Sequence, residues 1–193
     1  MLKMAVLLSG SGRTLDNFHE RIEKGSLQAQ IQVVISNVEG VLGLQKADNY
    51  GYPAFYAQDN DAINSILKDY DVDIIALAGY LKLYSPPPSL KKSVINIHPS
   101  LIPAFCGDGF YGSRVHRAVL KRGCLVSGCT VHLANEVYDE GPIIYQQTVT
   151  LDYDDTPDTI ATKVFDAECE AFPEAINRVD DRGIDFFWNR TQG

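Results

Sequence analysis

Residues 73 to 78 read Asp73-Ile74-Ile75-Ala76-Leu77-Ala78, a continuous apolar run that predicts a strand buried on both faces. Strands of this kind are typical of a parallel sheet that carries helices on both sides. Working outward from this run, strand patterns and helix patterns alternate along most of the chain. The alternation predicts an α/β fold with a mostly parallel sheet flanked by helices.

The spacing of apolar residues gives the expected boundaries of these elements. Strands are expected over residues 4–8, 31–36, 54–56, 73–78, 94–97, 128–133 and 143–151. Helices are expected over residues 14–23, 44–49, 61–67, 115–121 and 156–176. The last two strands suit an antiparallel extension of the sheet. Thr156 is a candidate N-cap for the longest helix, with Pro157 in its first turn.

The composition is that of an ordinary soluble globular protein, with 45% hydrophobic and 22% charged residues. A length of 193 residues suits a single domain over residues 1–193. The formal net charge of -8 repels phosphate backbones, so we expect neither nucleic acid nor an anionic membrane as a partner. No apolar run reaches the roughly 18 residues that are needed to span a bilayer.

The four cysteines are Cys106, Cys124, Cys129 and Cys169. They form no CxxC pair, and their spacing fits neither a zinc site nor a disulfide scaffold. Reduced thiols are the simplest interpretation, and they predict a cytoplasmic protein without a metal site. The sequence leaves the oligomeric state open between a monomer and a homodimer.

The segment Ser9-Gly10-Ser11-Gly12-Arg13-Thr14 joins the first strand to the first helix. Glycines let a ligand approach the backbone closely, and the N–H groups at a helix N-terminus attract anions. We therefore favour a phosphate site here over a plain tight turn. Leu15 stands where a dinucleotide fingerprint has its third glycine, and no Walker lysine follows, so the segment fits neither motif fully.

The segment Asn96-Ile97-His98-Pro99-Ser100 follows a β-branched strand. Because side chains two residues apart on a strand share a face, we expect Asn96 and His98 to converge. Pro99 lacks an N–H, so the sheet should stop there. An amide donor beside an imidazole suits chemistry in which charge develops on an oxygen while a proton moves. A structural role for His98 is the alternative interpretation.

Two further segments are candidates for the same site. Residues 138–142 predict a turn, and Asp139 within it would tune the imidazole of His98 if the turn folded back beside that residue. Residues 80–85 leave the central strand and are apolar and aromatic, which suits either a flat ring ligand or simple core packing.

The other histidines are interpreted as structural. His132 lies inside a strand pattern, whereas His19 and His116 lie on helix patterns and suit surface or packing positions.

Together these segments resemble the folate-dependent glycinamide ribonucleotide formyltransferases of purine biosynthesis, and the match runs nearly end to end. Its most specific parts are LLSGSGRTL, LAGYLKLYSP, INIHPSLIPAF, GCTVH and VYDEGPII, in the order and approximate spacing of that family. The resemblance implies a Rossmann-like formyltransferase fold. NIHPSLIP occurs across the wider superfamily, whereas SGSGRTL favours the glycinamide branch over the methionyl-tRNA branch.

The resemblance implies transfer of a formyl group from 10-formyltetrahydrofolate, a co-substrate, to the amine of glycinamide ribonucleotide. The phosphate of the ribonucleotide would lie on Gly10, Ser11, Gly12, Arg13 and Thr14, and Glu168 would meet its glycinamide end. The folate would lie against Tyr80, Leu81, Lys82, Leu83, Tyr84 and Ser85. The resemblance makes Asn96, His98 and Asp139 the catalytic residues.

The chain departs from the family at two places. Residues 106–112 form a loop that looks longer than in the better-known members, and a substrate lid is one hypothesis for it. Phe165 stands where some members carry a polar residue near the phosphate, so no phosphate contact is inferred for Phe165.

Two rival functions stay open. A formyltetrahydrofolate hydrolase shares the Asn, His and Asp set but passes the formyl group to water, and it usually carries an extra domain before the first strand. A non-catalytic nucleotide-binding module is more distant. The missing third glycine and the lack of an acidic residue at the end of the second strand, Ile35-Ser36-Asn37, argue against that module.

Overall fold

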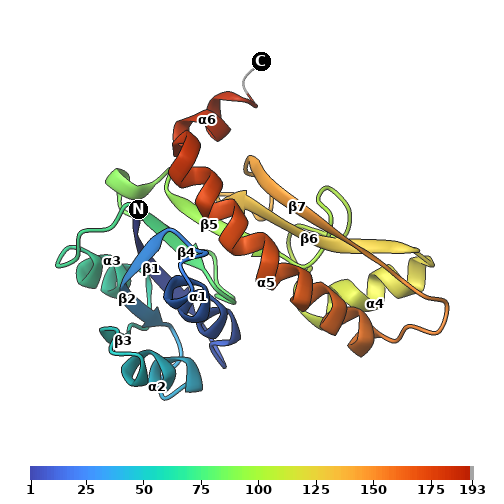
Figure 1. Cartoon of the computed structure of the whole chain (residues 1–193), viewed down its shortest axis with the longest axis horizontal. Helices are drawn as coiled ribbons and strands as arrows, with labels where there is room; N and C mark the ends of the chain where they lie inside the picture. Colours follow the sequence, from blue (N-terminus) through green and yellow to red (C-terminus); the bar gives the residue numbers. More distant parts are fainter. Residues whose placement is uncertain (192–193) are drawn as a thin grey trace.

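A seven-stranded mixed sheet forms the centre of the molecule in a computed structural model, which describes residues 1–191 (Figure 1). The strands are β1 (Leu2–Leu8), β2 (Ala29–Ser36), β3 (Ala54–Tyr56), β4 (Ile74–Leu77), β5 (Val94–His98), β6 (Val126–Leu133) and β7 (Ile143–Thr150). Their order across the sheet is β3-β2-β1-β4-β5-β6-β7. The first five strands of this order are parallel, whereas β6 and β7 pair antiparallel. The predicted fold class, with its antiparallel extension, is confirmed.

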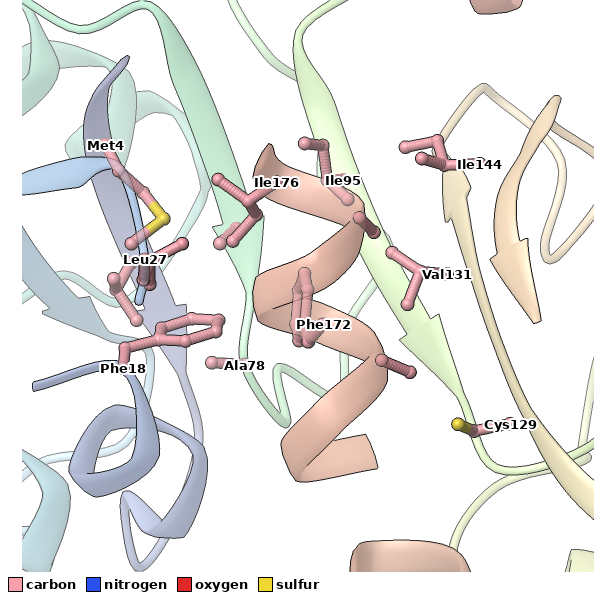
Figure 2. Close-up of a cluster of buried hydrophobic side chains, with 14 of the residues drawn as sticks. Met4, Phe18, Leu27, Ala78, Ile95, Cys129, Val131, Ile144, Phe172 and Ile176 are labelled. Atoms are coloured by element: carbon pink, nitrogen blue, oxygen red, sulfur yellow. The ribbon is translucent and has the colours of Figure 1, made fainter. Parts of the chain in front are cut away.

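Helices cover both faces of this sheet. They are α1 (Arg13–Glu23), α2 (Leu42–Asn49), α3 (Asn60–Leu67), α4 (Ser113–Arg122), α5 (Pro157–Arg182) and α6 (Ile184–Asn189), with a short 3₁₀ turn η1 (Pro88–Leu90). One hydrophobic cluster joins α1, α4 and α5 to the face that presents Met4, and a second joins α3 to the opposite face through Ile63. In the first cluster (Figure 2), Phe18 of α1 meets Phe172 of α5 edge to face at 5.0 Å.

The longest helix, α5, begins as predicted. The Thr156 hydroxyl accepts the N–H of Thr159, and the Thr159 hydroxyl accepts the N–H of Thr156, which forms a capping box. The helix continues beyond the predicted end at Ile176 because its buried face extends to Val179. Helix α6, which was not predicted, follows directly. No helix within residues 1–191 is long and apolar enough to cross a membrane.

The remaining boundaries differ from the predicted ones by a few residues at the element ends. The strand predicted over residues 73–78 is shorter, and β4 covers Ile74–Leu77. Helix α4 begins at Ser113, two residues before its predicted start, and Gly123 caps its end with a left-handed backbone. The elements therefore lie in the predicted order, and residues 99–112 form a long loop between β5 and α4.

Candidate active site

The candidate residues gather at the carboxyl edge of the parallel strands. Strands β1 and β4 are neighbours, but after β1 the chain continues to β2 on one side of the pair and after β4 it continues to β5 on the other side. Ligands bind at such a point of reversal in open α/β sheets. The Ser9 hydroxyl connects the two loops, since it accepts the N–H of Leu81 at 3.0 Å and donates to the Asn37 side-chain oxygen at 2.6 Å. The loops after β1, β2 and β4 are therefore joined at one hydroxyl group.

Strand pairing places Asn96 beside a histidine. Asn96 of β5 lies directly opposite His132 of β6, so their side chains share one face of the sheet. The Asn96 side-chain nitrogen lies 3.1 Å from His132 Nε2. His98 follows two residues later, and its side chain is buried on that same side. The expected convergence of Asn96 and His98 is thus present.

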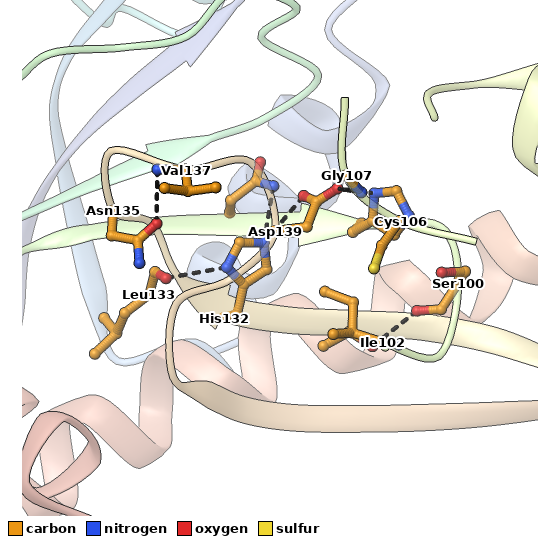
Figure 3. A network of polar contacts seen from close by, with 12 residues as sticks. Ser100, Ile102, Cys106, Gly107, His132, Leu133, Asn135, Val137 and Asp139 are labelled. Atoms are coloured by element: carbon orange, nitrogen blue, oxygen red, sulfur yellow. Dashed lines mark hydrogen bonds and ion pairs between the residues drawn. The ribbon is translucent and has the colours of Figure 1, made fainter. Parts of the chain in front are cut away.

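Asp139 lies between the two histidines. One carboxylate oxygen is 3.3 Å from His98 Nδ1, and the other is 3.5 Å from His132 Nε2. The backbone N–H of Gly107 donates to the same carboxylate at 2.9 Å, as Figure 3 shows. Asp139 has a φ of 60°, an unusual backbone for a residue other than glycine. The turn over residues 138–142 therefore does fold back beside His98.

Gly141 explains how the turn can fold so tightly. A Cβ at this position would lie 1.7 Å from the carbonyl oxygen of Leu133, at the end of β6. Only glycine leaves room for that contact between backbone segments. The turn that carries Asp139 is therefore pressed against the strand that carries His132.

The protonation of this cluster is set by burial and by close contacts. Burial lowers the pKa of His98, although the Asp139 carboxylate opposes the shift. Burial also disfavours the Asp139 carboxylate, but its contacts with His132, His98 and the Gly107 N–H outweigh that effect and lower the pKa of Asp139 overall. At neutral pH the arrangement is therefore a carboxylate beside a neutral imidazole.

The hydrogen bonds of His98 decide which nitrogen can take up a proton. His98 Nε2 lies 2.9 Å from the carbonyl oxygen of Phe105, so Nε2 carries the hydrogen and donates it. Nδ1 then faces the Asp139 carboxylate. A proton arriving at Nδ1 would be shared with Asp139, so the pair can act as an internal proton acceptor.

A cavity of about 340 Å³ is lined by the residues of this cluster. Thr14 of α1 and Glu168 of α5 also line it. Other lining residues come from the segment after β4, the 106–112 loop and the turn that carries Asp139: Tyr80, Leu81, Lys82, Leu83, Tyr84, Phe110, Tyr111, Val137 and Tyr138. The cavity therefore has a polar floor and a largely apolar wall.

Residues 80–85 divide between packing and lining. Tyr80 and Tyr84 are buried, and the Tyr84 hydroxyl donates to the Asn64 side-chain oxygen at 2.7 Å. Leu81 is 68% exposed and Leu83 is 42% exposed, and both line the cavity. The tyrosines of this segment therefore pack in the core, whereas its leucines offer an apolar surface to the cavity.

Glu168 on α5 is an acidic residue that also lines the cavity. Burial raises the pKa of its carboxyl group to about 7, and the positive charge of Arg13 opposes that shift. The carboxyl group is therefore only partly ionised at neutral pH. A cationic ligand group beside it would favour the ionised form.

The turn after β1 presents backbone donors to solvent. Gly12 has a left-handed backbone at the start of α1, and no side chain caps that helix. Gly43 of α2 packs against the turn, with its N–H donating to the Gly10 carbonyl at 3.0 Å. A Cβ on Gly12 would lie 2.7 Å from the Gly43 Cα. The space supplied by Gly43 explains how the turn stays compact although Leu15 replaces the third glycine of the fingerprint.

Sequence reasoning missed His132 as a site residue. Its side chain is buried, as a structural role would require, but its ring also contacts Asn96 and Asp139 in the floor of the cavity. The two-residue period of β6 could not reveal this, because the contact depends on the register between β5 and β6. His116 is buried, in agreement with a packing position. No group of three His, Cys, Asp or Glu residues within residues 1–191 is placed to hold a metal ion.

Comparison with known proteins identifies similar sequences over most of the chain. The family model described as formyl transferase matches residues 2–176. A chloroplastic phosphoribosylglycinamide formyltransferase of Vigna unguiculata is 36% identical, covering 94% of this chain and 62% of that protein. The trifunctional purine biosynthetic protein adenosine-3 of Homo sapiens is 37% identical, covering 92% of this chain but only 18% of that protein. The chain thus spans less than two thirds of these curated relatives.

Solved structures of similar length also match. Glycinamide ribonucleotide transformylase 1 from Symbiobacterium toebii superposes with a TM-score of 0.83 at 34% identity, covering 91% of this chain and 86% of that one. Phosphoribosylglycinamide formyltransferase from Brucella melitensis gives a TM-score of 0.83 at 32% identity, covering 94% of this chain and 96% of that one.

Proposed function

This chain belongs to the formyl transferase family, and on that premise we propose that it transfers a formyl group from 10-formyltetrahydrofolate to the amine of glycinamide ribonucleotide. We place this reaction in purine biosynthesis, because the Homo sapiens relative is named a purine biosynthetic protein. One observation carries the proposal. Asn96, His98 and Asp139 meet in the lining of a cavity that Glu168 also lines.

The ribonucleotide is proposed to bind between α1 and α5. Its phosphate would accept hydrogen bonds from the backbone of residues 10–14, where the helix N-terminus adds partial positive charge. Its glycinamide end would then approach Glu168. Because the substrate brings an ammonium group or an amine to this carboxyl group, binding would favour the ionised form of Glu168.

The folate is proposed to lie along the other part of the cavity. Leu81 and Leu83 offer an apolar surface to a flat ring, and Tyr138 lines the wall beyond the cluster. The 106–112 loop contributes residues 107–112 to the same cavity. This position would bring the formyl group of the folate over Asn96 and His98.

The proposed chemistry is direct acyl transfer. The neutral amine attacks the formyl carbon, and a C–N bond forms as the formyl oxygen gains negative charge. The Asn96 side-chain N–H₂ donates to that oxygen, and His98 stabilises the same charge once it has taken up the proton that the amine loses. The bond between the formyl carbon and the folate N10 then breaks. The proton lost by the amine passes by way of the His98–Asp139 pair, or a water held by Asp139, to N10.

The domain organisation, the cellular location and the oligomeric state are inferred from the sequence alone. We infer a single domain over residues 1–193, a cytoplasmic location and a monomer or homodimer. The small-molecule substrates are the expected partners, rather than nucleic acid or a membrane, because the net charge is -8.

A spectrophotometric assay of the purified protein tests the function. The substrate is a 10-formyl folate, supplied with and without glycinamide ribonucleotide. Appearance of the deformylated folate only in the presence of the ribonucleotide is the expected result. Deformylation without it would identify a hydrolase instead. Absence of turnover in both samples, with folded protein that still binds nucleotide, would favour a non-catalytic module.

A further inference from the structure

The side chain of Arg13 rests on an aromatic ring of another helix. Arg13 is the first residue of α1, and its guanidinium carbon lies 3.5 Å from the centre of the Phe165 ring on α5. A guanidinium at this distance over a ring is held by both cation–π attraction and planar stacking. The stack therefore fixes the direction in which an otherwise exposed arginine points.

The ring itself is held by the packing between the two helices. Figure 1 shows α1 lying beside α5, and Phe18 and Phe172 pack edge to face between them. Arg21 of α1 also forms an ion pair with Glu170 of α5. Because these contacts fix α1 relative to α5, Phe165 offers a rigid surface to the Arg13 side chain.

The charge of Arg13 is not neutralised by a neighbouring carboxylate. Within residues 1–191, Arg13 takes part in no ion pair, although its positive charge acts to lower the pKa of the Glu168 carboxyl group. Stacking uses the face of the guanidinium and leaves the N–H donors at its edge available. Arg13 is itself the first residue of α1, whose first N–H groups are not capped by a side chain.

We propose that Phe165 is a positioning residue, whose ring holds the Arg13 guanidinium at the start of α1 so that it binds the phosphate of the substrate. This inference rests on the proposed function and adds a side-chain cation to the backbone donors of residues 10–14. It also gives Phe165 a role: α5 contributes a ring that directs an arginine of α1, in place of a polar group of its own.

Steady-state kinetics with varied ribonucleotide provide the test. Phe165→Leu keeps an apolar side chain but removes the ring, so the KM for the ribonucleotide should rise about 3- to 10-fold. Arg13→Gln should raise the same KM roughly 10- to 100-fold, because a charged partner of the phosphate is lost. In both variants kcat and the KM for the folate should change less than about twofold. Phe165→Tyr keeps the ring and should restore the wild-type KM.

A double variant tests whether the two residues act together. If the ring works through the arginine, Phe165→Leu should have no further effect on KM in the Arg13→Gln background. Phe186→Leu is the matched control. The guanidinium carbon of Arg182 on α5 lies 5.0 Å from the centre of the Phe186 ring on α6, and neither residue lines the cavity. This control should leave every kinetic constant unchanged.

Competition by inorganic phosphate separates phosphate binding from other causes of a higher KM. Its inhibition constant against the ribonucleotide should rise in Phe165→Leu and Arg13→Gln by factors that follow the rise in KM. An unchanged inhibition constant, or equal effects of Phe165→Leu in the presence and absence of Arg13, would overturn the inference. Arg13→Gln leaves the helix packing intact, so it remains informative if Phe165→Leu unfolds. Failure of the wild-type protein to formylate the ribonucleotide would contradict the proposed function instead.

Discussion

Asn96 owes its position to the two-residue period of β5 and to the register with β6, which sets it opposite His132. As the proposed donor to the developing oxyanion, it is the residue whose loss should affect the chemical step most selectively. We expect Asn96→Ala to lower kcat by roughly 10²- to 10³-fold with a small change in KM. Asn49→Ala, at the end of α2 and outside the cavity, is the control. Retention of nearly full kcat in Asn96→Ala would exclude the proposed role.

Asp139 and Glu140 are adjacent carboxylates in very different surroundings. Asp139 is buried against two histidines, whereas Glu140 is exposed. Asp139→Asn keeps the size of the side chain but removes its charge, so proton transfer should slow and kcat should fall about 10²-fold or more. Glu140→Gln should retain wild-type kcat. Equal rates for the two variants, measured with saturating substrates, would show that Asp139 takes no part in proton transfer.

The residues of the candidate site differ in how far the sequence could predict them. Asn96 and His98 are close in sequence, and the local geometry of a strand was enough to pair them. The sequence suggested Asp139 as a site residue but could not predict its contact with His98. That contact depends on how a turn more than forty residues further along the chain folds back. His132 was missed because strand register is a property of two elements together.

At the scale of an element, the turn over residues 138–142 depends on one glycine. A methyl group on Gly141 would collide with the Leu133 carbonyl oxygen, so Gly141→Ala must shift the turn or the end of β6. We expect a loss of roughly 2 to 4 kcal/mol in the free energy of unfolding, together with a loss of activity as Asp139 moves. Urea unfolding and the formyl-transfer assay measure the two effects.

The control for this prediction is Gly25→Ala, at the end of α1. Gly25 has a φ of 70°, but nothing lies within 4 Å of a Cβ there. Alanine at Gly25 should therefore cost only the backbone strain, about 1 kcal/mol, and leave activity unchanged. If Gly141→Ala were as mild as Gly25→Ala, the close packing of the turn against β6 would not be needed for the fold.

Whole elements were easier to predict than their ends. Apolar spacing identified every strand and the five longer helices, because each element must bury one face or both. The predicted end of α5 at Ile176 was wrong, because buried Val179 keeps the helix packed to Arg182. Helix α6 is too short for periodicity to reveal it.

At the scale of the whole molecule, the strand order cannot be obtained from local patterns. Alternating strands and helices predict a parallel sheet, but they do not say that β1 lies between β2 and β4. The strand order depends on how the crossover connections place elements that are far apart in the sequence, and no local pattern specifies that. It matters for function because it brings the loops after β1 and β4 to one edge of the sheet.

Glu168 should affect the pH dependence of global stability. Its pKa is raised to about 7 in the folded protein, from an ordinary value of 4.5. The folded state therefore binds the extra proton between these values, and the stability it contributes is present below pH 4.5 and is lost progressively as pH rises through 7. Glu168→Gln stays neutral, so it should be more stable than the wild type by about 1 to 3 kcal/mol at pH 8.

Urea unfolding at pH 5 and pH 8 provides the measurement. The advantage of Glu168→Gln should shrink strongly at pH 5, where the wild-type carboxyl group is protonated in the folded state. Asp166→Asn, which replaces an exposed carboxylate on the same helix, should follow the wild-type profile. A constant difference between Glu168→Gln and the wild type at both pH values would contradict the raised pKa.

The hydroxyl of Ser9 has a consequence for the entropy of ligand binding. Because it accepts the Leu81 N–H and donates to Asn37, the loops after three different strands become ordered when the chain folds. Less conformational freedom then remains to be lost when either substrate arrives, which strengthens binding without any additional contact. Neither substrate needs the other to arrange these loops, so this part of the site is compatible with either order of addition.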